Sequence, residues 1–494
     1  MAIDTEERPL ATLDRSPQSE DPEALIAEAR DRQRRRRRRT FAIVVAAAAS
    51  GAVAFGIIRA TSEGTSAIVH PPHGPTVAVK ALDKHGTLAF VSRGTLWLLD
   101  GSNGRLRKLA SPPGFTPAQP MFSPDGTWLA YLEQHSTPSS LTSRLWLARA
   151  DGSGADAVPG YPTDTLIGWR PAPTPIASDL LAVTTGPDRH HQPCPCYSPT
   201  TLRVLSPDGS SRVIARADWI YGGAWSPNGE SIAVAQIERT VSTIVVHPLD
   251  GGPAKVWLRR TAHQRFNGMN GALFDIAGWW PGLGIGFWGF GDGSIHNNDA
   301  TLLNVVRTPG APPRPLGPTL SDGTTDQVAA SRLGSIAVVT DHGGGRSAWQ
   351  DKSIKLCSAT AGSCRELPHP TGTVTVAPSW SPDGRTLAYV VAPNVRTGPW
   401  TQRNLARWFA AHRVFLYDTD THTTHELTAA RGATAINWSN DGESLLFVRQ
   451  NALWLQPKLT ERPERIATPL FQPGNWPQYY AQIAWADQFA WSSP

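Results

Sequence analysis

The chain has 494 residues, of which 43 are proline, 44 are glycine and 19 are tryptophan. So much proline and glycine argues against a mainly helical protein, because both residues weaken helices and favour turns. Charged residues make up only 18% and the formal net charge is +5, which is small for this length and indicates no particular partner, nucleic acid included.

The N-terminal region combines a polar tail with one apolar run. Residues 1–40 end in an arginine block, Arg34 to Arg39, and an uncharged apolar stretch follows from Phe41 to Ile58. That stretch is close to the shortest that spans a bilayer as a helix, and arginines keep their end of such a span in the cytoplasm. The pattern predicts a cytoplasmic tail at 1–40, a single transmembrane signal anchor at 41–58, and the rest of the chain outside the cell membrane.

Two other interpretations of this region stay open. The apolar run could be a signal peptide that is cleaved, or the arginines could form a basic patch for nucleic acid. Residues 59–76 are rich in Thr, Ser, Gly and Pro, which predicts a linker between the membrane and a folded domain at 77–494.

A short motif recurs through that domain. Trp380-Ser381-Pro382-Asp383-Gly384 precedes a β-prone run, and related pentapeptides begin at Phe122, Trp225 and Trp438. Pro, Asp and Gly favour a tight turn, so each copy predicts a strand, a turn and a second strand. Together with weaker copies, the markers are Phe122, Trp169, Trp225, Trp279, Val328, Trp380, Trp438 and Trp485. Their spacing is close to the roughly 40–50 residues of one four-stranded propeller blade.

These residues resemble the WD40-like, TolB-type β-propeller repeat, in which W-S-P-D-G is followed by L-A-F/Y, a pattern shared with the propellers of prolyl-oligopeptidase-type enzymes. The resemblance covers residues 77–494 and implies an all-β propeller of four-stranded blades. Counting Trp485 within a blade shared by both chain ends gives eight blades, and seven is the alternative. The closing strand is predicted at 480–485, paired with a strand at 87–91, although a strand at 77–82 could take its place. The tryptophans are expected to pack between blades.

The four cysteines form two close pairs. Cys357 and Cys364 flank the turn of a predicted hairpin, and a location outside the cytoplasm permits a disulfide between them. Cys194 and Cys196 follow two adjacent histidines; this pair could form a disulfide or, with the histidines, bind zinc or copper.

One segment interrupts the strand pattern. Between Trp400 and His412 the apolar residues recur at helical spacing, and Thr401 can cap the helix. Its apolar face could pack on its own blade, or the helix could project as a docking surface for a partner. The residues of that candidate surface are Trp400, Arg403, Arg407 and Trp408.

The sequence has no pattern typical of a metalloprotease, a hydrolase nucleophile or a phosphate-binding loop. We therefore predict no catalytic residue, no cofactor and no metal site. It predicts a non-enzymatic, membrane-anchored propeller that binds a protein, a peptide or a cell-envelope ligand. Two alternatives stay open: a propeller enzyme of the metal-dependent lactonase or cyclase type, and a transmembrane sensor. The repeat does not identify the ligand, because one fold hosts many functions.

Overall fold

In the computed structural model, the chain divides into two units, Met1–Thr61 and Ser62–Pro494. The structure describes residues 68–69, 74–137, 141–159, 162–171, 180–186, 200–238, 241–261, 265–266, 269–270, 273–290, 300–320, 327–345, 347–358, 364–396, 401–471 and 483–494. The predicted tail and transmembrane span, Cys194 and Cys196 lie outside these residues. Within the described residues, no helix is both long and apolar enough to cross a membrane.

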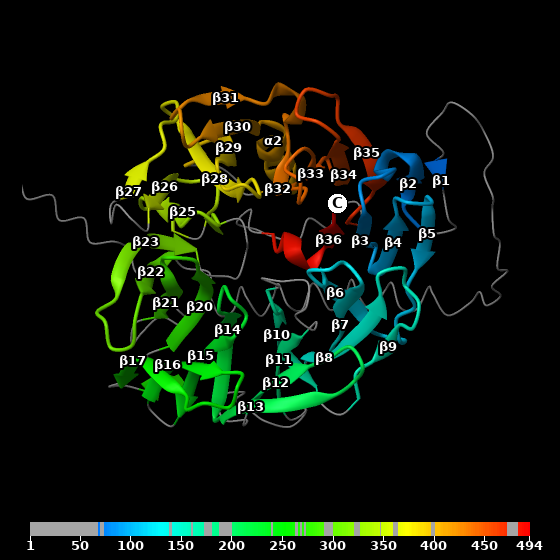
Figure 1. The fold of residues 1–494 in the computed structure, drawn as a ribbon. Helices are drawn as coiled ribbons and strands as arrows, with labels where there is room; N and C mark the ends of the chain where they lie inside the picture. Colours follow the sequence, from blue (N-terminus) through cyan, green and yellow to red (C-terminus); the bar gives the residue numbers. More distant parts are fainter. Residues whose placement is uncertain are drawn as a thin grey trace, which may run out of the picture. The chain divides into compact units, whose positions relative to one another are not determined.

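Eight four-stranded antiparallel sheets follow one another around a ring as the blades of a β-propeller (Figure 1). Blade 1 consists of β36 (Phe489–Ser492), β3 (Thr87–Ser92), β4 (Thr95–Asp100) and β5 (Arg105–Lys108); blade 2 of β6 (Thr116–Phe122), β7 (Trp128–Ser136), β8 (Leu141–Arg149) and β9 (Asp156–Ala157); blade 3 of β10 (Thr163–Trp169), β11 (Leu181–Thr185), β12 (Thr200–Leu205) and β13 (Ser211–Ala217); blade 4 of β14 (Trp219–Trp225), β15 (Ser231–Glu238), β16 (Val241–Pro248) and β17 (Lys255–Thr261). Blade 5 consists of β20 (Leu273–Trp280), β21 (Gly284–Phe290), β22 (Ala300–Val306) and β23 (Arg314–Leu320); blade 6 of β24 (Val328–Ala330), β25 (Ser335–Asp341), β26 (Lys352–Ser358) and β27 (Cys364–Glu366); blade 7 of β28 (Thr373–Trp380), β29 (Thr386–Pro393), β30 (Arg413–Asp418) and β31 (Thr424–Glu426); blade 8 of β32 (Thr434–Trp438), β33 (Leu445–Arg449), β34 (Ala452–Gln456) and β35 (Glu464–Thr468). The predicted all-β propeller of eight blades is confirmed.

The remaining elements are short. They are the strands β1 (Ile68–Val69), β2 (Thr76–Ala78), β18 (Arg265–Phe266) and β19 (Met269–Asn270), the helix α2 (Gln402–Ala410), and the 3-10 helices η1 (Val79–Leu82), η4 (Thr428–Ala430) and η5 (Trp485–Asp487). Buried apolar residues form clusters between neighbouring blades, and one cluster runs from blade 6 through blades 7 and 8 to blade 1.

The repeated serine holds each tight turn together. In blade 7, the Ser381 hydroxyl donates to Asp383 Oδ1 at 2.5 Å and accepts from the backbone N–H of Thr386 at 2.9 Å. Gly384 has a φ of 74°, a conformation that favours glycine. The corresponding hydroxyls of Ser123 and Ser226 make the same pair of bonds. The motif therefore encodes a turn that satisfies its own polar groups.

The repeated tryptophan links neighbouring blades by a hydrogen bond. The indole Nε1 of Trp225 donates to the carbonyl oxygen of Gly168 in the preceding blade at 2.8 Å. The accepting residue is the one just before Trp169, the marker of that blade. The same bond recurs from Trp169 to Met121 O, from Trp380 to Ala329 O and from Trp438 to Ser379 O, at 3.0–3.1 Å. We call these four contacts the indole bridges.

Three of the four accepting carbonyls follow a register shift in an innermost strand. Gly168, Met121 and Ser379 are each the first paired residue after such a shift, whereas Ala329 lies in a regularly paired strand. Two residues before the acceptors Met121 and Ser379, Gln119 and Ala377 both have a φ of 53°. Pro120 and Pro378 follow them, at a bulge of an edge strand, where proline is tolerated.

The ring closes through the C-terminal strand, but not at the predicted residues. Strand β36 pairs with β3, placing Trp491 opposite Leu88 and Phe489 opposite Phe90. The predicted closing segment at 480–485 is wrong: Trp485 lies in η5, is buried, and its ring is 5.8 Å from that of Phe471. The true marker of blade 1 is Trp491, because the connection before β36 is longer than the repeat spacing suggested. Val328 is misplaced similarly, since Ala330 occupies the marker position opposite Ile336.

The N-terminal strand joins the other side of the same junction. The segment predicted as an alternative strand at 77–82 contributes only the end of β2, which pairs with β35 of blade 8, and then forms η1. Blade 8 is thereby extended to six strands by β2 and β1. The Ser92 hydroxyl of blade 1 also donates to Pro469 O at 2.5 Å, and Asn440 N donates to Ser493 Oγ at 2.7 Å. Both chain segments therefore tie blade 8 to blade 1.

The two faces of the ring differ in their connections. Because the blade strands are antiparallel, the turns after the first and third strands lie on one face, here called the short-turn face. Connections between the second and third strands, and links to the next blade, lie on the opposite face, here called the long-loop face. The segments 342–351 and 394–412, which contains α2, are both on the long-loop face.

We expect that removing one indole bridge lowers the free energy of unfolding by more than the smaller aromatic side chain alone accounts for. Trp225→Phe removes the donor and leaves the buried Gly168 carbonyl without it, which costs about 1–3 kcal/mol. Trp288→Phe is the matched control, because Trp288 is equally buried and its Nε1 has no hydrogen-bond partner. Urea unfolding should show a larger loss for Trp225→Phe, and equal losses would contradict the role of the bridge.

We also expect β36 to be indispensable. Deleting residues 488–494 removes the innermost strand of blade 1 and buried Phe489, and truncating one buried aromatic ring alone costs about 3–5 kcal/mol. Thermal unfolding followed by near-UV circular dichroism should show a much lower melting temperature or aggregation. Deleting only exposed Pro494 is the control. An unchanged melting temperature for the longer deletion would mean that the ring is complete without β36.

Candidate functional site

A cleft of about 840 Å³ lies on the long-loop face, where blade 3 meets blade 4. Arg216 and Ala217 at the end of β13, followed by Asp218, form one wall. Strands β15, β16 and β17 of blade 4 supply the rest. The residues of blade 4 that line the cleft are Gln236, Glu238, Val241, Thr243, Val245, Val256 and Arg259.

The strand register explains why these residues share one side of blade 4. Thr243 lies opposite both Gln236 and Arg259, so the three side chains form a polar row across the sheet. Val245 lies opposite Val256 in the adjacent apolar row. Val256 is 53% exposed, so its side chain presents apolar surface to the cleft. The cleft therefore has an apolar strip beside a polar row.

The charged groups of the cleft are balanced: two arginines and two carboxylates. Within the part of the chain that the structure describes, Arg216, Arg259 and Glu238 make no ion pair or side-chain hydrogen bond. The Gln236 Oε1 atom is buried without a hydrogen-bond partner. Buried polar atoms are nearly always hydrogen-bonded, so this oxygen is an acceptor available to a ligand or water. The cleft can bind charged and hydrogen-bonding groups without first breaking contacts of these side chains.

A second group of interest lies between the innermost strands of blades 4 and 5. Asp275 is the third residue of β20, an innermost strand, and burial raises its pKa to about 7, although the Ile276 N–H lowers it in part. A Cβ on Gly222 of blade 4 would lie 3.1 Å from Asp275 Oδ1, so the missing side chain of that glycine leaves room for the carboxyl group. A carboxyl with such a pKa can exchange protons near neutral pH.

A second buried carboxyl belongs to η5. Asp487 in η5 precedes β36 of blade 1, whereas Asp275 belongs to blade 5. Burial raises the pKa of Asp487, and a hydrogen bond from Gln119 lowers it in part. The described residues contain no group of three His, Cys, Asp or Glu side chains that could hold a metal ion.

The predicted helix forms, but the residues of the predicted docking surface do not all lie on its exposed side. Thr401 caps α2 by accepting from the Asn404 N–H at 3.2 Å. Trp408 is only 5% exposed and packs its ring 5.7 Å from that of Trp349, with its Nε1 donating to Pro393 O at 2.9 Å. It therefore belongs to the core and not to a partner surface.

The other residues of that predicted surface have different positions. Arg403 and Arg407 are exposed on α2, while Trp400 lies outside the described residues. The helix is amphipathic because its apolar side packs on its own blade, which accounts for the periodicity without a partner. On α2, the side chains that a partner could contact are therefore the two exposed arginines.

His412 completes the packing under α2. Its side chain is 1% exposed, and its ring centroid is 4.4 Å from that of Trp408 and 5.1 Å from that of Phe409. Nδ1 lies 3.0 Å from Ala433 O and therefore carries the proton, while Nε2 has no partner. Burial lowers the pKa of His412 to about 4, although the bond to Ala433 raises it in part. The imidazole is neutral in the folded protein at pH 7.

The other long connection on this face is organised by a buried lysine. The ammonium group of Lys352 donates to Asp341 Oδ1 at 2.6 Å, to Gly345 O at 3.0 Å and to Gln350 O at 3.1 Å. Burial lowers the pKa of Lys352, and the contact with Asp341 opposes that shift. All three ammonium donors have acceptors, so Lys352 holds the loop in place and has no capacity left for a ligand.

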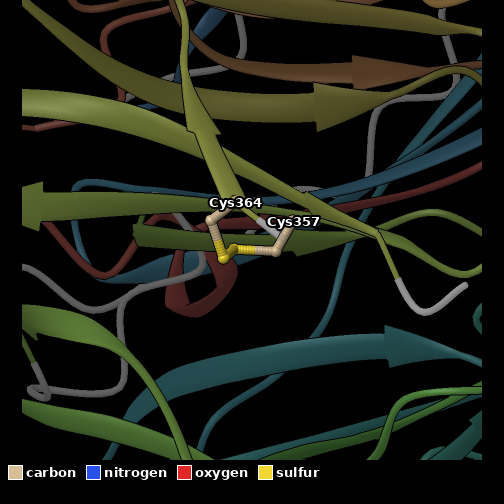
Figure 2. Close-up of a disulfide and its surroundings, with 2 residues drawn as sticks. All are labelled: Cys357 and Cys364. Atoms are coloured by element: carbon tan, nitrogen blue, oxygen red, sulfur yellow. A yellow bond between two sulfur atoms is a disulfide. The ribbon is translucent and has the colours of Figure 1, made fainter. Parts of the chain in front are cut away.

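Cys357 and Cys364 form a disulfide (Figure 2). They lie opposite each other on β26 and β27, with their Cα atoms 4.0 Å apart. Cys357 is fully buried and Cys364 is exposed at the outer edge of blade 6. The bond fastens the outermost strand of that blade to its neighbour.

The cleft itself was not foreseen from the sequence. Its residues come from four strands and one link, and no motif connects them. The only local signal is the mixture of basic and apolar residues in β17, where Lys255, Arg259 and Arg260 accompany exposed Val256. The contact between Asp275 and Gly222 could not be predicted from the sequence either, because the two residues belong to neighbouring blades and meet only when the blades pack together.

Several solved structures are similar to this chain. An oligogalacturonate lyase in complex with manganese has 11% identity and a TM-score of 0.40, and the match covers 83% of this chain and 98% of that one. TolB from Acinetobacter baumannii has 12% identity and a TM-score of 0.30, covering 78% and 80%. Prolyl oligopeptidase B from Galerina marginata has 12% identity and a TM-score of 0.40, and this chain spans only 57% of it. These are likenesses of fold alone. No protein-family model and no curated protein matches the sequence.

We expect acidification to weaken the folded state through His412. Its pKa is about 4 when folded and about 6.5 when unfolded, so the unfolded chain binds the proton first as pH falls. Stability is lost from about pH 6.5 down to pH 4, by at most ~3 kcal/mol. His412→Asn keeps an N–H donor but cannot titrate. Urea unfolding at pH 7 and pH 4 should show a smaller loss for this variant than for the wild type.

A matched variant separates this effect from general acid denaturation. His425 is exposed, and His425→Asn should retain the wild-type dependence on pH. If His412→Asn loses as much stability on acidification as the wild type, the burial of a neutral imidazole does not control this dependence.

Proposed function

We propose that this protein is a membrane-anchored β-propeller outside the cytoplasm that binds a protein, a peptide or a cell-envelope ligand without transforming it. The cleft between blades 3 and 4 is the observation that carries the proposal. It combines an exposed apolar strip, charged groups of both signs and the unpartnered Gln236 Oε1. Concave surfaces with an apolar floor and a few polar groups are the usual sites of recognition in proteins.

Two independent features support the location. The arginine block before the apolar run 41–58 favours a span whose N-terminal end stays in the cytoplasm. The disulfide between Cys357 and Cys364 also fits an oxidising compartment, where such bonds persist. The exposed arginines of α2, Arg403 and Arg407, extend the charged surface of the long-loop face available to a partner.

A propeller enzyme is the second candidate, and Asp275 is the observation that favours it. A buried carboxyl with a pKa of about 7 has the property of a general acid or base. Within the described residues, it belongs to no cluster of three side chains that could hold a metal ion. A turnover of lactones or peptides that disappears in Asp275→Asn would favour this candidate over a binding module.

The binding proposal predicts that ligand contacts are confined to one face. A photo-crosslinking amino acid is placed at Val256, the exposed residue of the cleft, or, as the matched control, at Asp208 in an exposed turn of the short-turn face. Irradiation of intact cells should give an adduct from position 256 and none from position 208. External protease should then shorten the adduct, because the propeller lies outside.

Two results would contradict the proposal. Adducts of equal yield from both faces would mean that the long-loop face is not the binding face. An adduct that resists external protease in intact cells, but not in lysed cells, would place the propeller on the cytoplasmic side.

A further inference from the structure

The cleft has a charge pattern that selects among ligands. We propose that it binds a short peptide carrying both a free carboxylate and an ammonium group, with an apolar side chain between them. This inference rests on the proposed function, because it names the ligand class of that same site. The juxtaposition that carries it is two arginines and two carboxylates around one apolar strip.

The arginines provide the site for the carboxylate. Arg216 comes from the end of β13 and Arg259 from β17, so the two guanidinium groups approach the cleft from neighbouring blades. Both are exposed, and within the described residues neither has an ion-pair partner. Guanidinium groups bind carboxylates through paired, charge-assisted hydrogen bonds.

The acidic residues provide the site for the ammonium group. Asp218 follows Arg216 by two residues, and Glu238 ends β15 beside the cleft. Their presence makes a purely anionic ligand unfavourable, since it would bring negative charges close to both carboxylates. A purely cationic ligand meets the same repulsion from the arginines. A ligand with both charges meets the two arginines with its carboxylate and Glu238 with its ammonium group.

The remaining contacts suit a peptide in particular. Val245 and Val256 form the apolar strip, and the 53% exposure of Val256 leaves surface that an apolar side chain would cover. The Gln236 Oε1 atom needs a donor, which a peptide N–H supplies. A free amino acid has both charges but no amide N–H between them, so it would leave this oxygen unsatisfied.

The test uses the full chain, purified in detergent, with the tripeptide Ala-Val-Ala as the probe. Saturation-transfer NMR titrations measure its dissociation constant alongside those of the N-acetylated and the C-amidated tripeptides. We expect each blocked peptide to bind about tenfold more weakly than the free one, since a lost charged contact of ~1.4 kcal/mol corresponds to tenfold. Equal affinities for all three, or no binding of the free peptide at millimolar concentration, would overturn the inference.

Two variants assign the ends of the peptide. Arg259→Gln should weaken binding of the free peptide about tenfold and leave binding of the amidated peptide unchanged. Glu238→Gln should likewise weaken binding of the free peptide about tenfold, but leave binding of the acetylated peptide unchanged. Arg212→Gln is the matched control, because Arg212 is exposed on β13 but does not line the cleft. If Arg259→Gln weakens the free and amidated peptides equally, the carboxylate does not bind at that arginine and the inference fails.

Failure here is distinguishable from failure of the proposed function. Adducts confined to position 256 in the cleft, together with tripeptides that do not bind, would retain a binding module and reject this ligand class. Tripeptides that bind selectively, with no adduct from either face, would retain the peptide site and reject the larger partner.

Discussion

The hydrogen bond from an indole N–H to the carbonyl of the preceding blade is the constraint on which the rest of the ring depends. A propeller blade buries apolar side chains against its neighbours, but burial alone is non-directional and would let blades slide. The bridges at Trp169, Trp225, Trp380 and Trp438 fix the height of one blade against the next. Three of the four acceptors, Gly168, Met121 and Ser379, come directly after a bulge of an innermost strand, so these bulges belong to the same contact.

This requirement separates the parts of the molecule that repeat from those that vary. The turn serines, the glycines of the repeated turns and the marker tryptophans serve the short-turn face or the blade interfaces. The long-loop face accommodates α2, the loop held by Lys352 and the cleft. Among the described residues of this face, buried Lys352 and His412 stabilise their own loops, whereas the exposed arginines of α2 and the cleft are accessible to a ligand.

The sequence predicted the architecture because each blade repeats the same local chemistry. Strand, turn and blade number follow from residues that are close together in the chain, as at Trp380 to Gly384. The closing strand was misplaced because Trp485 has the repeat spacing, whereas Trp491 has the partner, Leu88, that lies about 400 residues away in the chain. The cleft could not be predicted at all. Arg216 and Arg259 meet only because blades 3 and 4 pack together, and no local pattern records which side chains of two blades will share a gap.

The placement of β36 and β2 across one junction has a consequence for the order of synthesis. Blade 1 holds only three of its strands until the last one has left the ribosome, and β3 meanwhile presents an unpaired inner edge. Blades 2 to 7 contain only strands that are consecutive in the chain, so they can form as they emerge. Until β36 emerges, the nascent chain is therefore an open arc with an unpaired strand edge at β3, and the pairing of β36 with β3 closes it into a ring.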